Sequence, residues 1–179
     1  MYNNSLFGKK IVALMLMILS LFSAMPALAV TPNNNRLMWK VFAPQGSGFS
    51  VRMPGQPVKK VDAVVTQYSC LEEMAGRKYF YGVAHQEYQS VPVNVEETLR
   101  TQCNDFAKGF KGQIVKRVAV TKNGYRGVIV RVESPDNTAV FAVWLVNRRV
   151  YGITFATHKT TILPDEARQF IDSLALTGN

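Results

Sequence analysis

The chain is poor in the residue types from which catalytic and metal sites are usually built. Its 179 residues include two His and two Cys, and 12 acidic residues stand against 21 Lys and Arg. It contains no glycine-rich phosphate loop of the pattern G-x-x-x-x-G-K or G-x-G-x-x-G, and no G-x-S-x-G nucleophile elbow. We therefore expect a protein that is not an enzyme and carries no cofactor.

The high hydrophobic content, 47%, is concentrated at the N-terminus. Residues 1–29 hold Lys9 and Lys10, an apolar run from Ile11 to Phe22, and an A-x-A box that ends at Ala29. This pattern predicts a secretory signal peptide over residues 1–29. An uncleaved membrane anchor is the less favoured alternative, because the apolar stretch is just long enough to span a bilayer.

Without residues 1–29, the chain keeps 150 residues, with 19 Lys and Arg against 12 acidic residues, a net charge of +7. That length is typical of one domain. We expect a flexible lead-in over residues 30–36 and a single domain over residues 37–179. Export predicts a location in the periplasm, or in the thylakoid lumen if the source is a phototroph, and it argues against nucleic acid as a partner.

The two cysteines, Cys70 and Cys103, both lie in the part that we expect to be exported. An even number of cysteines in an oxidising compartment favours a disulfide between them. Two buried free thiols are the alternative, since free cysteine packs as a small apolar residue.

The 150 residues after position 29 are rich in β-branched residues, with 21 Val and only 7 Leu, which favours strands over helices. Alternating patterns and turn signals predict strands over 37–42, 49–53, 61–72, 77–88, 114–120, 125–133, 139–146 and 150–157. The strand over 139–146 is apolar on both faces, so it should be central. Helices are predicted over 94–111, with Asn94 as the cap, and from about Pro164 onward. The fold class is therefore α+β, an antiparallel sheet sandwiched between helices.

The two histidines do not form a recognisable metal motif. His85 and Glu87 share one face of their predicted strand, but a zinc site needs at least one more ligand. His158 is the one other histidine available. We therefore expect no metal site, and interpret His85 as a partly exposed strand residue beside a carboxylate.

Basic doublets recur at the predicted turns, and two of them form our candidate partner-binding rim. Arg77 and Lys78 follow one turn, and Arg148 and Arg149 follow another. Such a rim would bind an acidic protein, or alternatively the head groups of anionic lipids at a membrane surface. A solvated surface that aids solubility is the simpler interpretation of these charges.

A cleft between sheet and helix is the alternative site. Tyr79, Tyr81 and Trp144 would line it and bind a small ligand or lipid; ordinary packing in the core is the competing interpretation of the three aromatic residues.

Five segments carry a resemblance to a group of small exported bacterial proteins, common in cyanobacteria and planctomycetes. They are 39–42 (WKVF), 48–54 (GFSVRMP), 124–127 (GYRG), 143–151 (VWLVNRRVY) and 170–174 (FIDSL). The group resembles the Mog1/PsbP-like fold superfamily. Its PsbP-like members are extrinsic, non-enzymatic subunits or assembly factors of photosynthetic complexes, and Mog1 is a cofactor for a small GTPase. The resemblance thus implies an accessory protein that docks on an envelope or thylakoid-lumen complex.

Overall fold

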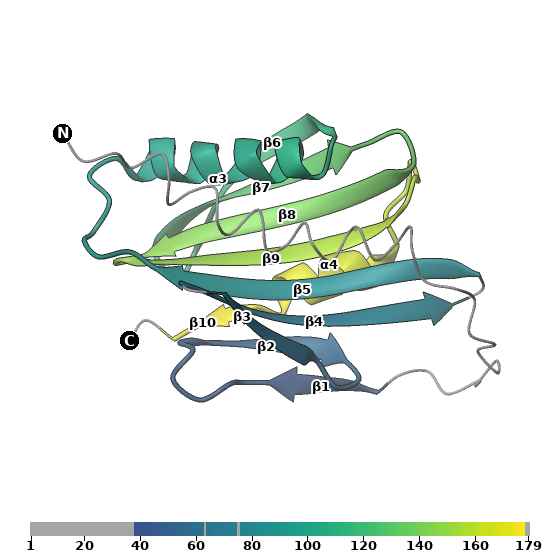
Figure 1. The fold of residues 1–179 in the computed structure, drawn as a ribbon, viewed down its shortest axis with the longest axis horizontal. Helices are drawn as coiled ribbons and strands as arrows, with labels where there is room; N and C mark the ends of the chain where they lie inside the picture. The colour runs from purple at the N-terminus through teal and green to yellow at the C-terminus, as the bar shows by residue number, and fades with distance from the viewer. Residues whose placement is uncertain (1–37, 63, 75, 178–179) are drawn as a thin grey trace.

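A computed structural model describes residues 38–62, 64–74 and 76–177. The predicted signal peptide and the lead-in over 30–36 lie outside the described residues. Two sheets and two helices make up the described fold (Figure 1). In chain order the elements are β1 (Trp39–Phe42), β2 (Phe49–Pro54), β3 (Val58–Asp62), β4 (Val65–Met74), β5 (Arg77–Glu87), α3 (Val95–Gly109), β6 (Gln113–Lys122), β7 (Tyr125–Glu133), β8 (Asn137–Val146), β9 (Arg149–His158), α4 (Asp165–Asp172) and β10 (Ala175–Leu176).

The larger sheet has seven strands in the order β3-β4-β5-β9-β8-β7-β6, and every neighbouring pair is antiparallel. Helix α3 packs on one face, against β6, β7 and β8, whereas α4 and β2 lie on the other face. The small sheet β1-β2-β10 joins α4 in that second layer. The predicted α+β architecture, an antiparallel sheet between helices, is confirmed.

Two hydrophobic cores lie on the two faces of this sheet because neighbouring residues of a strand point to opposite sides. On β5, Phe80 and Ala84 belong to the core under α3, whereas Tyr81 and Val83 belong to the core under α4. Strand β8 is buried at every residue from Thr138 to Val146. The prediction of a central strand that is apolar on both faces is therefore confirmed.

Helix α3 begins at the predicted cap, Asn94, and ends at Gly109, two residues before the predicted end. The side chain of Asn94 accepts a hydrogen bond from the backbone N–H of Glu97 at 3.0 Å, and so caps the first turn. At the other end, the N–H of Gly112 donates to the carbonyl of Ala107 at 3.0 Å. A Cβ on Gly112 would lie 2.7 Å from the carbonyl oxygen of Glu133, so only glycine allows α3 to end this close to β7.

One predicted strand is wrong in its bounds. The stretch 61–72 is divided between β3 and β4, which form a hairpin in which Asp62 pairs with Val65. Val61, Val64 and Val65 continue the β-branched pattern through the turn, and no Gly or Pro marks it. Asp62, at the start of the turn, is a weaker turn signal than the Pro-Gly and Asn-Gly pairs that mark other turns of this chain.

The predicted disulfide is not formed, because the two thiols belong to different cores. Cys70 packs in the core under α4, and Cys103, on α3, packs in the core on the opposite face of the sheet. Both are free and buried. Burial raises the pKa of each thiol to about 11, so both are protonated at neutral pH.

This placement predicts how the thiols react. In the folded protein, a thiol reagent at neutral pH should label neither cysteine, because burial excludes the reagent and thiolate is scarce. After unfolding in denaturant without reductant, both thiols of the chain should react. Mass spectrometry of the labelled protein measures the count, and an unreduced, unfolded chain that takes up no label would contradict the prediction.

Candidate functional site

The structure does not bring the four residues of the predicted basic rim together. Arg77 and Lys78 begin β5, whereas Arg148 and Arg149 lie beside Glu87, at the end of β5, because Glu87 pairs with Arg149. The two doublets are therefore separated by most of the strand, about 30 Å at roughly 3.3 Å per residue. The prediction of one shared rim is wrong, since strand pairing decides which hairpins lie at the same end of a sheet.

Arg149 is engaged in holding the fold. Its guanidinium donates to the carbonyl of Ser47 at 3.2 Å and to the hydroxyl of Tyr151 at 3.4 Å, and it pairs with Glu87 at 3.0 Å. Tyr151 in turn donates to the same Ser47 carbonyl at 3.1 Å. Together they fasten the loop between β1 and β2 to β9. The hydrogen bond and charge of Arg149 hold the pKa of Glu87 below its usual range.

The residues of the predicted cleft are part of the core. Tyr81 and Trp144 are 2% and 1% exposed, and the ring of Tyr79 packs beside Phe155. Trp144 lies against Gly127, where an added Cβ would come within 2.4 Å of the indole. These contacts leave no room for a ligand beside Trp144, so ordinary packing explains the three aromatic residues.

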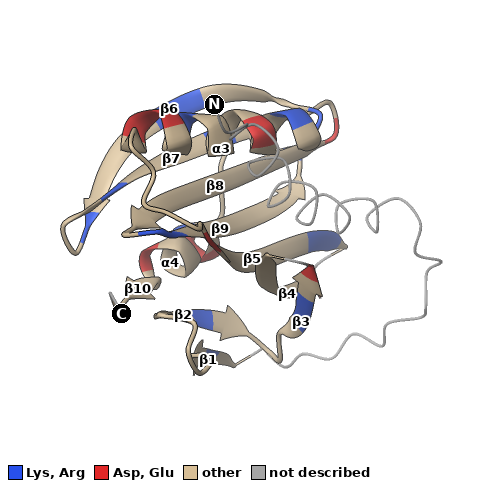
Figure 2. Ribbon diagram, turned by 60° about the vertical axis from the view of Figure 1, so that its left-hand side comes forward, with Lys and Arg blue, Asp and Glu red and all other residues tan. Residues whose placement is uncertain are grey.

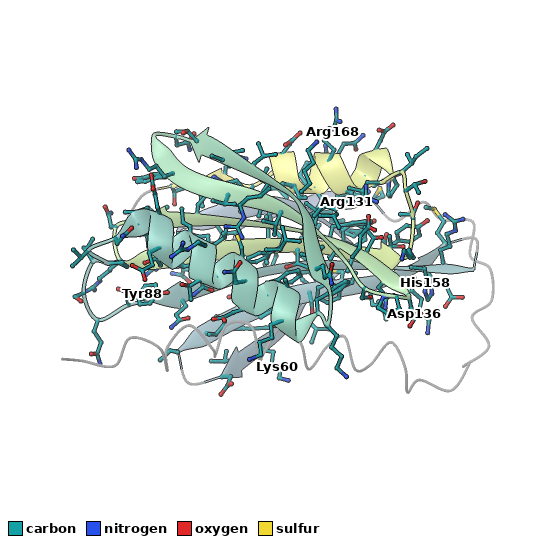
Figure 3. All side chains as sticks on the ribbon, turned by 90° about the horizontal axis from the view of Figure 1, so that it is seen from above. Lys60, Tyr88, Arg131, Asp136, His158 and Arg168 are labelled. Carbon is teal, nitrogen blue, oxygen red and sulfur yellow. The ribbon has the colours of Figure 1, made fainter. Side chains whose placement is uncertain are left out.

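The two histidines are far apart. His85 packs beside the rings of Phe49 and Tyr151, and its partner in the pairing of β5 with β9 is Tyr151. His158 lies seven residues farther along β9, about 23 Å away at 3.3 Å per residue. Figure 3 shows His158 next to Asp136 at one end of the sheet, with Tyr88 at the other end. Within the described ranges, no three His, Cys, Asp or Glu side chains gather as metal ligands would.

The strongest candidate site is a groove between α3 and the strands β6 and β7. Two hollows follow one another along it, of about 650 and 640 Å³. Arg117 lines both, so they form one groove along the helix. Its other charged lining residues are four cations, Arg100, Lys108, Lys116 and Arg126, and one carboxylate, that of Glu96. We call this feature the basic groove.

The periodicity of α3 and of β6 places charged side chains on both walls of the basic groove. On α3, Arg100, Asn104 and Lys108 are spaced four residues apart and so form one line along the helix surface. On β6, Arg117 pairs with Val130, a residue of the core under α3, so both point to the α3 side of the sheet. The pattern thus places the Arg117 side chain opposite the polar line of the helix.

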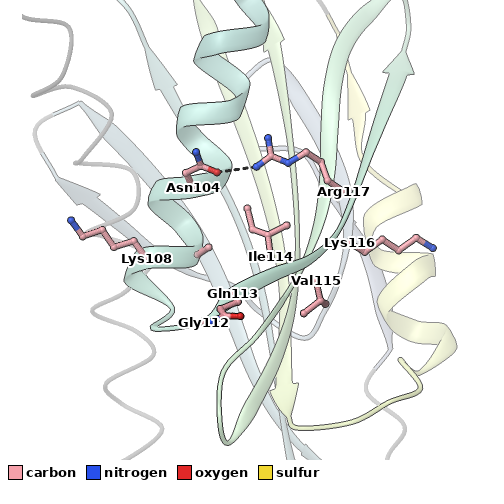
Figure 4. Close-up of a pocket in the computed structure, with 9 residues that line it drawn as sticks. Asn104, Lys108, Gly112, Gln113, Ile114, Val115, Lys116 and Arg117 are labelled. Atoms are coloured by element: carbon pink, nitrogen blue, oxygen red, sulfur yellow. Dashed lines mark hydrogen bonds between the residues drawn. The ribbon is translucent and has the colours of Figure 1, made fainter.

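The cations of the basic groove do not converge on one point. Arg117 reaches across the groove and donates to the side-chain oxygen of Asn104 at 2.8 Å. Figure 4 shows Lys108 and Lys116 extending to opposite sides of this bridge. Arg126 lies at the other end, 3.2 Å from Glu96, in a pair whose side chains are 69% and 81% exposed. This spread suits an extended acidic surface better than a single small anion.

The sequence interpretation missed the basic groove although its elements were visible. Lys116 and Arg117 are a further pair of adjacent basic residues, but the predicted binding surface lay at the hairpin turns instead. The line of Arg100, Asn104 and Lys108, on the helix side away from the buried stripe, was the signal that could have found it.

The role of Arg149 can be tested on stability. Replacing Arg149 by Ala removes hydrogen bonds to the Ser47 carbonyl and the Tyr151 hydroxyl, and should lower the free energy of unfolding by about 1–3 kcal/mol. Arg148→Ala is the matched control, because the Arg148 side chain is 58% exposed and its ion pair is with the 41% exposed side chain of Glu87. Urea denaturation measures both. Equal losses of stability in the two variants would contradict the role assigned to Arg149, which is to hold the loop between β1 and β2 against β9.

The burial of His85 predicts a loss of stability in acid. Desolvation, and then the charge of Arg149, lower its pKa from 6.5 to about 4. The unfolded chain therefore binds a proton that the folded one does not, and stability falls as the pH drops from about 6.5 to about 4. Because the ring is only partly buried, we expect a contribution of about 1–2 kcal/mol.

The comparison of wild type with His85→Gln isolates this contribution from that of other titrating groups. Urea denaturation at pH 7 and at pH 4.5 should show a larger loss of stability in the wild type than in the variant. The same pH dependence in both proteins would show that His85 is not responsible.

Among the described residues, neither helix is long and apolar enough to cross a bilayer. No protein-family model matches the sequence. No curated protein matches it either.

Comparison with solved structures finds a relative in fold. The chain is similar to the solution structure of cyanobacterial PsbP (CyanoP) from Synechocystis sp. PCC 6803, with a TM-score of 0.52 and 11% identity, over 84% of this chain and 99% of that one. A crystal structure from Bacteroides thetaiotaomicron overlaps with a TM-score of 0.36 and 14% identity, over 77% of this chain and 48% of that one, too low a score to carry an argument. The described part of this chain has the PsbP-like fold.

Proposed function

We propose that this chain is an exported, non-catalytic accessory protein that docks on an acidic surface of another protein through the basic groove. The observation that carries the proposal is the charge of that groove, where four cations face one carboxylate. Lys116 also lines the groove, but its side chain points to the opposite face of the sheet. Electrostatic complementarity of this kind steers association and selects among partners. The partner is an acidic protein of the envelope or of the thylakoid lumen.

Two further observations support this choice of surface. Arg148 and Arg149 are both paired with Glu87, so their charge is partly cancelled. Lys122 donates to the carbonyls of Asp172 and Leu174, at 3.0 and 2.6 Å, and so is occupied at the end of α4. By contrast, the cations on the groove face one carboxylate, and their charge is available to a partner.

The accessory role is supported by the fold and by the expected export. The PsbP-like fold is shared with cyanobacterial PsbP, and the sequence resemblance described above implies extrinsic, non-enzymatic subunits or assembly factors. The signal peptide predicted over residues 1–29 takes the domain to the compartment where such complexes lie. The cations of the basic groove then supply what the fold alone does not, a surface for docking.

Charge reversal tests the proposal. The triple variant Arg100→Glu, Lys108→Glu, Arg117→Glu should bind its partner roughly tenfold more weakly or worse, because attraction becomes repulsion. The matched control is Arg77→Glu, Lys78→Glu, Lys159→Glu, which reverses three charges at the ends of β5 and β9, away from the groove. The control should bind like the wild type.

To identify the partner, a photoreactive amino acid is placed at position 104, in the basic groove. The protein is cross-linked in an extract of exported proteins, and the cross-linked partner is identified by mass spectrometry. Affinity for that partner is then measured for the three proteins at 50 and 300 mM salt. Weaker binding at high salt is expected, because exposed charges are screened. Equal binding by both triple variants, or binding that does not respond to salt, would refute docking through the basic groove.

A further inference from the structure

Strand β6 forms an open edge of the seven-stranded sheet. In the described part of the chain it pairs with β7 alone, and the sheet order ends there. Seven of its ten residues are exposed, among them Val115 and Val118, which are 54% and 42% exposed. An edge strand presents alternate N–H and C=O groups that another strand can pair with. The edge lies along one wall of the basic groove.

The usable length of this edge is seven residues. A register shift between Ile114 and Lys116 disturbs the start of β6, after which every residue from Lys116 to Lys122 pairs in step with β7. The opposite edge of the sheet is β3, which has five residues and is exposed throughout. Of the two edges, β6 therefore offers the longer regular template for an added strand.

Cations lie on both faces of this edge strand. Arg117 points to the α3 side with Arg126 nearby, and Lys116 points to the other side because neighbouring residues alternate. Figure 2 shows Lys and Arg along β6 at the border of the sheet. Charged edges of this kind repel a second copy of the same strand. The same charges attract a strand that carries carboxylates on both of its faces.

We propose that an extended acidic segment of the partner adds to the sheet beside β6 as an eighth strand. Its backbone pairs with the outward N–H and C=O groups between Lys116 and Lys122, and its carboxylates face Arg117 on one side and Lys116 on the other. Pairing of the main chain gives affinity, and the charges give selectivity. The inference rests on the proposed function, since it names the part of the partner that the basic groove receives.

The probe for the test is a synthetic nine-residue peptide, blocked at both ends, in which pairs of Glu alternate with pairs of Val. Because neighbouring residues of a strand point to opposite faces, this order puts carboxylates on both faces of the extended peptide. Two N-methylated versions carry methyl groups on the odd or on the even residues. Since alternate N–H groups of a strand point to opposite edges, one version blocks pairing with β6 and the other leaves it open. A version with Gln in place of Glu tests the charge.

Strand addition predicts that one N-methylated peptide binds at least tenfold more weakly than the unmodified peptide, while the other keeps its affinity. Hydrogen exchange should show protection of alternate amides between Lys116 and Lys122 only when the peptide is bound, since β7 already protects the others. The Gln peptide and the triple charge-reversal variant should both bind weakly.

The outcomes separate this inference from the proposed function. If both N-methylated peptides bind like the parent, while charge reversal still weakens binding, the groove receives an acidic partner without strand addition, and the inference falls alone. If the unmodified peptide does not bind, or if β6 is protected by a second copy at high protein concentration, the inference also falls. Failure of the charge-reversal experiment with the cross-linked partner would overturn the proposed function itself.

Discussion

Burial of the paired strands β8 and β9 on both faces is the constraint to which the rest of the structure conforms. Between Thr138 and Val146, and again between Val150 and Thr157, neither strand carries a charged residue, and all of these residues are buried. A strand of this kind needs a packed layer on each side. Helix α3 supplies one layer, and α4 with β2 supplies the other. Charged side chains are thereby left to the strand ends and the sheet edges.

Local patterns were enough to predict much of this arrangement. The Asn94 cap with Glu97 predicted the start of α3, and the uninterrupted apolar run predicted the central position of β8. The patterns failed where pairing between distant segments decided the outcome. Cys70 and Cys103 lie on opposite faces of the sheet because of strand alternation and helix packing, and neither can be read from the spacing of the two cysteines.

At the candidate site, too, local sequence patterns do not predict what the pairing of distant segments decides. Arg149 and Arg117 each belong to a basic doublet, and nothing in the local sequence distinguishes them. In the fold, Arg149 is held by Glu87, Tyr151 and the Ser47 carbonyl, whereas Arg117 reaches over the groove to a neutral amide. What an arginine does therefore depends on the register of β5 with β9 and of β6 with β7, which places a carboxylate beside one and not the other.

An edge strand is where such a sheet can acquire a partner without disturbing its core. The central strands are fixed by packing on both faces, so a substitution there changes stability before it changes recognition. Strand β6 lacks that restriction, because its side chains are largely exposed and its pairing with β7 alone holds it in place. In the strand addition that we propose, cations on both faces of β6 have two effects: they repel other copies of the chain, and they attract an acidic strand. On that proposal, selectivity for a partner depends on exposed side chains of β6, which can change without loss of the packing that holds the core.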